Sequence, residues 1–191
     1  MKTEHKILTQ LLTTKEPLTI REIAKRIQAD YHITHEATQR LLHRNILLGQ
    51  TIGKSTACRL DPSYYGSEIY LAEEERKKEV LKNKDLAQLY RHLLSHMLTS
   101  FFVLLVFGSH AKKTATVRSD IDLLLITNQE RAEEKMEEIL ATIPLNTHPI
   151  VITEAEFVRL KNAKPGNVIH EVMHNYIILY GTEAFYHLKN A

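Results

Sequence analysis

Two aspartates separated by one residue carry the clearest chemical signal in this sequence of 191 residues. Asp120 and Asp122 open an apolar segment, Asp120 to Thr127, that is predicted to be a strand. Because successive side chains of a strand alternate between its faces, both carboxylates project to the same side. Proteins bind Mg²⁺ through one or two carboxylates together with phosphate oxygens, and Mn²⁺ suits the same ligands. The pair therefore predicts a site for Mg²⁺ or Mn²⁺ that also holds a phosphorylated substrate.

A predicted turn precedes the aspartates by about ten residues. Gly108 follows the apolar run Phe101 to Phe107, which predicts a buried strand ending at a glycine. Ser109 then stands where a helix N-cap is expected, and the unpaired N–H groups of a first helical turn attract anions. Lys112 and Lys113 add positive charge close by. Phosphate is the anion that this turn predicts.

Together the turn and the carboxylates indicate a reaction class. In two-metal sites, ions about 3.5–4 Å apart clamp the attacking and leaving oxygens of an in-line displacement. The chemistry predicted for this segment is therefore nucleotidyl or phosphoryl transfer.

The same residues resemble the signature of the DNA polymerase beta-like nucleotidyltransferase superfamily, especially its small minimal members. Gly108, Ser109 and the segment Ser119 to Asp122 carry the resemblance. It implies a mixed sheet flanked by helices, with Asp120 and Asp122 as catalytic metal ligands. It further implies an NTP, with ATP as the expected nucleotide, bound at Gly108, Ser109, Lys112, Lys113 and Ser119.

Two departures from that pattern bear on catalysis. Lys113 stands where a glycine is common, which matters little if Ser109 to Lys113 is simply helical. Active members usually carry a third carboxylate on a later strand, yet the predicted strand His148 to Thr153 contains none. His148 is a candidate base or ligand in its place, although a lone histidine at a strand start is more often structural.

The glutamates that follow this strand are interpreted as part of a helix start. Thr153 followed three residues later by Glu156 is a capping box, with Glu154 in the first turn. A displaced third ligand is the alternative interpretation. Triphosphate and metal binding is thus better supported than turnover.

Composition is that of an ordinary globular protein, with 43% apolar and 25% charged residues. The single cysteine, Cys58, excludes an internal disulfide and fits a reducing compartment, so a cytoplasmic location is expected. No apolar run approaches the ~18 residues of a membrane span, and no signal peptide is recognised. Charge is uneven, since residues 1–60 hold ten Lys or Arg against five Asp or Glu. A modestly basic first domain is therefore predicted to precede an acidic one.

Apolar periodicity predicts three helices and a hairpin in the first sixty residues. Thr19 and Glu22 form a capping box for the second helix, and Thr34 is the predicted cap of the third. Gly53 supplies the apex of the hairpin turn. This order resembles a winged helix-turn-helix domain.

In that architecture the third helix enters a DNA major groove, and cationic side chains contact phosphates. A role in partner docking or homodimerisation remains open. The candidate DNA-binding residues are His35, Gln39, Arg40, His43, Arg44 and Lys54.

A competing motif lies near the C-terminus, where residues 170–174 read HEVMH. On a helix, HExxH places two histidines on one face to bind Zn²⁺, with the glutamate as general base. A zinc metallopeptidase is therefore a minor alternative. A helix that carries histidines for no metal is the preferred interpretation, because a chain with eleven histidines produces this pattern readily by chance.

The sequence thus predicts an α+β protein in three parts. These are a winged helix-turn-helix domain (1–62), a helical linker (63–98) and a nucleotidyltransferase domain with a mixed sheet flanked by helices (99–191). The predicted activity is transfer of a nucleoside monophosphate from an NTP to a hydroxyl acceptor. The alternative is a DNA-binding transcriptional regulator whose nucleotidyltransferase domain has lost catalysis.

Overall fold

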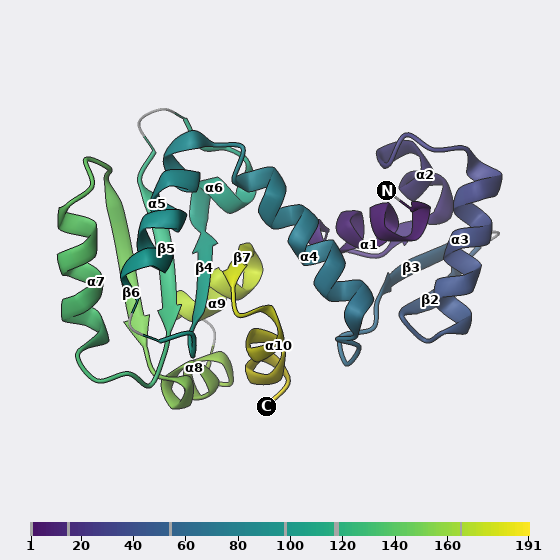
Figure 1. The fold of residues 1–191 in the computed structure, drawn as a ribbon. Helices are drawn as coiled ribbons and strands as arrows, with labels where there is room; N and C mark the ends of the chain where they lie inside the picture. Colours follow the sequence, from purple (N-terminus) through teal and green to yellow (C-terminus); the bar gives the residue numbers. More distant parts are fainter. Residues whose placement is uncertain (1, 15, 54, 98, 117–118, 165) are drawn as a thin grey trace. The chain divides into compact units, whose positions relative to one another are not determined.

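The computed structural model describes residues 2–14, 16–53, 55–97, 99–116, 119–164 and 166–191. The chain divides into two compact units, residues 1–75 and 76–191. Figure 1 shows the elements of both units. Both contain helices and sheet, so the predicted α+β class is confirmed.

The first unit has the element order of a winged helix-turn-helix. Its helices are α1 (Thr3–Thr13), α2 (Ile20–Arg26) and α3 (Tyr31–His43), and its strands are β1 (Leu18–Thr19), β2 (Leu47–Ile52) and β3 (Ser55–Leu60). The strands pair antiparallel in the order β1-β3-β2. Apolar residues from each of the three helices and from β2 and β3 are buried between them, so the small sheet and the helices share one core.

Helix starts in this unit follow side-chain chemistry. The capping box predicted at Thr19 is confirmed, because its Oγ1 accepts from Glu22 N and Glu22 accepts in return from Thr19 N. The cap predicted at Thr34 is wrong. Asp30 caps α3 instead and accepts from His32 N at 2.8 Å. Asp30 precedes the first helical residue, and so its carboxylate reaches the free N–H groups that Thr34, one turn further on, cannot.

The charged stretch after residue 66 forms two consecutive helices. Helix α4 (Ser67–Val80) is followed by α5 (Lys84–His96). Asn83 separates them, since its side chain accepts from Leu86 N at 3.0 Å and caps α5. The division between the two units falls within α4.

The second unit is built on a four-stranded mixed sheet in the order β6-β5-β4-β7. The strands are β4 (Val103–Phe107), β5 (Ile121–Ile126), β6 (Thr147–Ile152) and β7 (Tyr176–Tyr180). β5 runs parallel to β6 and antiparallel to β4. β6 lies at one edge of the sheet, where Pro149, which cannot donate to a ladder, is tolerated. Phe101 lies outside β4 and is 84% exposed. The observed strand therefore starts at Val103, two residues after the predicted start.

Helices cover both faces of this sheet. One face packs against α5 and α7 (Ala132–Ala141) through alternate strand residues such as Val106, Ile121 and Leu123. The other face carries Phe107 and Tyr176, which is paired with it across the antiparallel ladder. The ring centroid of Tyr176 lies 4.8 Å from that of Phe185 on α10 (Thr182–Asn190). Helices α8 (Glu154–Lys161) and α9 (Val168–His174) also belong to this unit, and α8 packs on both α9 and α10. Because side chains alternate, neighbouring residues of β5 face different helical layers.

Candidate functional site

The turn after β4 places glycine directly beside a carboxylate. Gly108 has φ +62°, a conformation that L side chains rarely adopt. A Cβ at this position would be 3.0 Å from Asp122 Cγ and closer still to Asp122 Oδ2. Asp122 is able to lie against the backbone of the turn because residue 108 has no side chain.

Ser109 lies within a short helix rather than at its cap. Helix α6 (Gly108–Lys112) begins two residues earlier than predicted, with Phe107 at the N-cap position and no side-chain cap bond. The predicted cap role of Ser109 is therefore wrong, because the turn at Gly108 already belongs to the helix. The Ser109 carbonyl accepts from Thr114 N at 3.0 Å, which closes the end of this short element.

The two lysines differ in conformation and in partners. Lys112 Nζ lies 3.8 Å from Glu171 Oε1 on α9. Lys113 has φ +59° and ends α6 in the left-handed region. The condition under which the replacement of glycine by Lys113 matters little, a simple helix from Ser109 to Lys113, is therefore not met. A left-handed residue is the usual way to end a helix, and glycine fits it with the least strain.

Asp120, Asp122 and His148 come together at one end of the sheet. Asp120 precedes β5, Asp122 is its second residue, and Asp122 pairs with His148 across the parallel ladder. His148 Nδ1 lies 3.6 Å from Asp122 Oδ1, and Nε2 lies 4.0 Å from Asp120 Oδ2. The Asp122 side chain is 27% exposed and that of Asp120 is 41% exposed, so both remain accessible to solvent ions.

The chemistry of this cluster suits a hard divalent cation that arrives with its substrate. Among the described residues, no three acidic, histidine or cysteine side chains converge as a ready metal site. Mg²⁺ does not need such a cage, since it keeps several waters and takes one or two carboxylates plus phosphate oxygens. The two aspartates fit that requirement.

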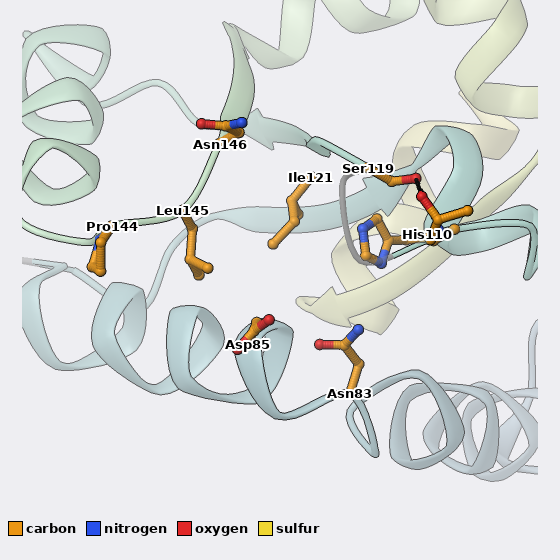
Figure 2. A pocket seen from close by; sticks show the side chains of 10 residues that line it. Asn83, Asp85, His110, Ser119, Ile121, Pro144, Leu145 and Asn146 are labelled. Atoms are coloured by element: carbon orange, nitrogen blue, oxygen red, sulfur yellow. Dashed lines mark hydrogen bonds between the residues drawn. The ribbon is translucent and has the colours of Figure 1, made fainter.

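Ser119 lies beside a cavity that sequence reasoning missed. Its Oγ accepts from Thr116 N at 2.9 Å. Together they line a cavity of about 410 Å³, shown in Figure 2. The other lining residues are Asn83, Asp85, His110, Ala115, Ile121, Pro144, Leu145 and Asn146. Asn83 could be recognised in the sequence as a helix cap. The other lining residues in this list come from separate segments, so no local sequence pattern links them to one cavity.

The glutamates after β6 are explained by helix capping. Glu156 Oε2 accepts from Thr153 N at 2.9 Å, and Thr153 Oγ1 accepts from Glu156 N at 3.2 Å. The predicted capping box is confirmed. The backbone bond from Thr153 and then its hydroxyl lower the pKa of Glu156 below its ordinary value.

The candidate DNA-binding residues lie on α3 and just beyond it. His35, Gln39, Arg40 and His43 are exposed or partly exposed along the helix, and Arg44 follows it. Arg40 Nε donates to Glu4 Oε1 at 2.7 Å. Arg44 forms ion pairs with Glu4 and Glu68. Lys54 lies outside the described residues.

The HExxH residues lie on helix α9, and both histidines and the glutamate have a contact within the protein. His170 Nε2 lies 2.9 Å from the Ala163 carbonyl, and His174 Nδ1 lies 2.7 Å from that of His170. Glu171 faces Lys112. The side chains of this motif are thus used in local contacts of the helix.

Comparison with known protein families finds a match in the C-terminal part of the chain. Residues 95–184 match the family model described as polymerase beta, nucleotidyltransferase. The matched segment contains β4, the Gly108 turn and both aspartates, and so it supports the superfamily assignment for this part of the chain. No curated protein matches the sequence.

A solved structure shows a distant likeness. It is described as TrmBL2, an archaeal chromatin protein with a novel mode of DNA binding. The likeness has a TM-score of 0.30 and 16% identity, over 85% of this chain and 66% of that one. This chain therefore spans slightly less than two thirds of that protein's length, and a likeness at this TM-score carries no argument about function.

No helix among the described residues is both long enough and apolar enough to cross a membrane.

Proposed function

We propose that residues 76–191 bind an NTP with Mg²⁺ or Mn²⁺ and transfer its nucleoside monophosphate to a hydroxyl acceptor. The observation that carries the proposal is the placement of Asp122 against Gly108, with Asp120 and His148 beside it. The match of this segment to the nucleotidyltransferase family model supports the reaction class. ATP is the first nucleotide to test.

The aspartates would hold the metal, which supplies charge neutralisation and alignment of the triphosphate when bound. Ser109, Lys112 and Lys113 lie on the turn that leads from β4 and are proposed to bind phosphate oxygens, with Ser119 at the opposite end of the loop. Helix α6 has only five residues, so its dipole is small and the lysine charges carry more of the binding. Lys112 would have to exchange its long, exposed contact with Glu171 for phosphate, at little cost.

The proposed transfer needs no reactant other than the NTP and the acceptor. The acceptor oxygen forms a bond to the α-phosphorus, the bond from that phosphorus to the bridging oxygen breaks, and pyrophosphate leaves. The acceptor proton must pass to a base or to water. His148 is the proposed base, because it lies on β6 beside both carboxylates.

Label transfer tests this proposal. The protein is incubated with each α-labelled NTP, Mg²⁺ or Mn²⁺, and protein or small-molecule hydroxyl acceptors. The variant Asp120→Ala plus Asp122→Ala should lose transfer by at least a hundredfold, whereas Glu133→Ala plus Glu134→Ala on α7 is the matched control for charge. Equal transfer by wild type and the aspartate variant would overturn the proposal.

The second candidate function is that of a DNA-binding regulator whose nucleotidyltransferase domain binds nucleotide without turnover. Active members of the superfamily usually carry a third carboxylate on a later strand, and here His148 lies beside the two aspartates instead. This difference favours a domain without turnover. In the same experiment, NTP binding without transfer to any acceptor, together with sequence-selective DNA binding, would favour the regulator.

DNA binding itself is proposed for the exposed side of α3. His35, Gln39 and His43 are available there to contact base edges, with Arg40, Arg44 and Lys54 as proposed phosphate contacts. The arginines already pair with Glu4 and Glu68, so phosphates must compete with these carboxylates. Fluorescence anisotropy with duplex DNA at several salt concentrations measures this binding, and an affinity independent of salt would contradict it.

A further inference from the structure

A cavity of about 490 Å³ lies at the end of the second unit's sheet opposite to Asp122. β4 begins there at Val103, β5 ends at Ile126 and β7 ends at Tyr180, and all three residues line the cavity. Helices α8 and α10 begin at the same end of the sheet (Figure 1). Asp122 is about 13 Å away from Ile126 along β5, at roughly 3.3 Å per residue. The described lining includes no residue of the proposed NTP site, so the two sites are separate.

An exposed aromatic ring stands beside this cavity on a backbone that is held in place. Phe101 lines the cavity and is 84% exposed. Its backbone N donates to Thr99 Oγ1 at 3.1 Å, and its carbonyl accepts from Thr127 Oγ1 at 3.2 Å. Because both polar groups of its backbone are bonded, the ring is presented to solvent by an ordered segment. Its apolar surface is therefore available to be buried against a ligand.

The rest of the lining is largely apolar as well. Ala184 is exposed and Tyr180 is partly exposed, while the buried Phe102 and Ile126 lie behind them. The ring centroids of Phe102 and Tyr180 are 4.4 Å apart in a stacked arrangement. Small-molecule sites are lined mostly by such side chains and have volumes of roughly 300–1,000 Å³. Apolar side chains offer no oxygen ligands to a metal ion, so an organic ligand suits this lining better.

The charge at the rim of the cavity is negative. Glu154 at the start of α8 and Glu183 at the start of α10 are exposed and line it. Neither carboxylate pairs with a lysine or arginine of the described residues. Their two full charges exceed the positive ends of the two helices, each equivalent to about half an elementary charge. His187 is the basic side chain of the described lining, and histidine carries little charge at about pH 8. Residue 98, the undescribed position closest in sequence to this lining, is a leucine and adds no charge. The rim therefore favours a cation.

A second copy of this chain is a less favourable occupant. Two facing copies would bring two Glu154 and two Glu183 carboxylates together, and like charges repel. Each Phe101 ring would bury roughly 150–250 Å², whereas a stable interface buries about 1,200 Å² or more in total. Both considerations favour a small ligand over a folded partner.

We propose that this cavity binds a small organic amine. The apolar or aromatic body of the amine lies against Phe101 and Ala184, and its ammonium group faces the carboxylates of Glu154 and Glu183. A cation beside the Phe101 ring gains further from the negative face of the aromatic system. The site needs neither an NTP nor a divalent metal, so it stands independently of the proposed function.

Three probes of one shape test the requirement for a cation. Phenethylamine, phenethyl alcohol and phenylacetate are titrated into the full chain at about pH 8, and binding is followed by two-dimensional amide NMR. Phenethylamine should bind with a dissociation constant of about 1 mM or lower and shift the amide signals of Thr182 to Ala184. The alcohol should bind about fivefold more weakly, and phenylacetate should not bind. Equal affinity for the amine and the alcohol would overturn the proposal.

Variants at the rim test the carboxylates. Glu154→Gln plus Glu183→Gln should weaken phenethylamine binding about fivefold or more and leave the affinity for phenethyl alcohol unchanged. Glu133→Gln plus Glu134→Gln on α7 is the matched control for charge. If the two double variants bind the amine equally well, the carboxylates of the rim do not recognise it and the proposal fails.

Variants of exposed residues test the apolar lining without disturbing the core. Phe101→Ala should weaken phenethylamine binding about fivefold or more, and Ala184→Leu should abolish it by filling the cavity. Ala155→Leu on α8 makes the same change at an exposed residue outside the described lining. All three variants should melt within a few degrees of wild type, because the replaced side chains are exposed. Binding that survives Ala184→Leu would overturn the proposal.

Two further measurements distinguish other occupants and the nucleotide site. Asp120→Ala plus Asp122→Ala should leave amine binding unchanged, and a loss of binding would contradict a separate site. Sedimentation equilibrium should show no dimer that Phe101→Ala dissociates. Such a dimer would assign this surface to a second copy, and an acetylated Phe-Lys amide that binds more than tenfold tighter than phenethylamine would assign it to a protein partner. Either result would overturn the proposal.

Discussion

Asp122 and Gly108 form a pair in which the carboxylate occupies the space that any side chain at position 108 would fill. The glycine is needed twice, once for its φ of +62° and once for this contact. The turn after β4 and the second residue of β5 thus depend on each other. A change at either one alters the position of the proposed metal ligand.

Gly108→Ala should destabilise the second unit and displace Asp122. The left-handed backbone alone costs about 1–2 kcal/mol for an L residue, and the clash with the carboxylate adds to this. Urea unfolding followed by circular dichroism measures the loss. Gly53→Ala is the matched control, because Gly53 has φ +60° with nothing within 4 Å of its added Cβ.

A double-mutant cycle isolates the contact itself. Gly108→Ala in the background of Asp122→Ala should cost less than Gly108→Ala alone, since the clash is absent. If the two costs are equal, the glycine serves backbone conformation only.

Lys113→Gly should stabilise the second unit while weakening NTP binding. Lys113 adopts φ +59°, where a lysine is strained and a glycine is not. Relief of that strain exceeds the added unfolded-state entropy of glycine by about 0.5–1 kcal/mol. Urea unfolding and NTP titration report the two effects separately, and a loss of stability would contradict the structural account.

The fold was predictable wherever the local signal was chemical and short in range. Thr153 and Glu156 mark a helix start by direct reciprocal bonding, and the apolar run before Gly108 marks β4. Boundaries that depend on backbone conformation were missed. Nothing in its residue type shows that Lys113 takes a left-handed conformation. Asp30 and Thr34 are both of types that cap helices, so residue type alone did not decide which of them faces the free N–H groups of α3.

The candidate site was predictable from spacing only in part. Strand alternation placed Asp120 and Asp122 on one side, but the register that puts His148 beside them comes from β5–β6 pairing. The cavity at His110 is lined by residues of α5, α6 and two loops, and these segments come together only through tertiary packing. The assignments of site residues and the domain boundaries stay predictions.

His148→Asp should strengthen divalent metal binding at the carboxylate cluster. His148 lies within 4.0 Å of both aspartates, and a third carboxylate there adds negative charge and oxygen ligands. We expect Mn²⁺ to bind about tenfold more tightly, as measured by electron paramagnetic resonance. His170→Asp on α9 controls for net charge. Unchanged Mn²⁺ affinity would show that position 148 does not reach the ion.

Glu4→Gln should strengthen DNA binding by the first unit if α3 is the contact surface. Glu4 pairs with Arg40 at 2.7 Å and with Arg44 at 3.7 Å, so its loss frees Arg40 for phosphates and leaves Arg44 paired with Glu68 alone. Affinity at low salt should rise about threefold or more, and the slope of log affinity against log salt concentration should steepen by about one, for one added phosphate contact. Glu16→Gln makes the same charge change without the pairing. Equal behaviour of the two variants would contradict a role for these arginines.

Glu156→Gln should make the free energy of unfolding of the second unit depend less on pH below about pH 5. Hydrogen bonds from Thr153 N and Oγ1 lower the pKa of Glu156 below its ordinary value of 4.5 in the folded chain. A depressed folded pKa contributes stability that is fully present above the unfolded pKa and disappears as pH falls through the folded pKa. The advantage of wild type over Glu156→Gln should therefore be constant above about pH 5 and shrink steadily below pH 4.5. Urea unfolding between pH 3 and 7 measures both proteins, with Glu154→Gln, whose carboxylate does not close the capping box, as the control. Parallel curves for wild type and Glu156→Gln would show that the capping bonds do not discriminate between the two protonation states.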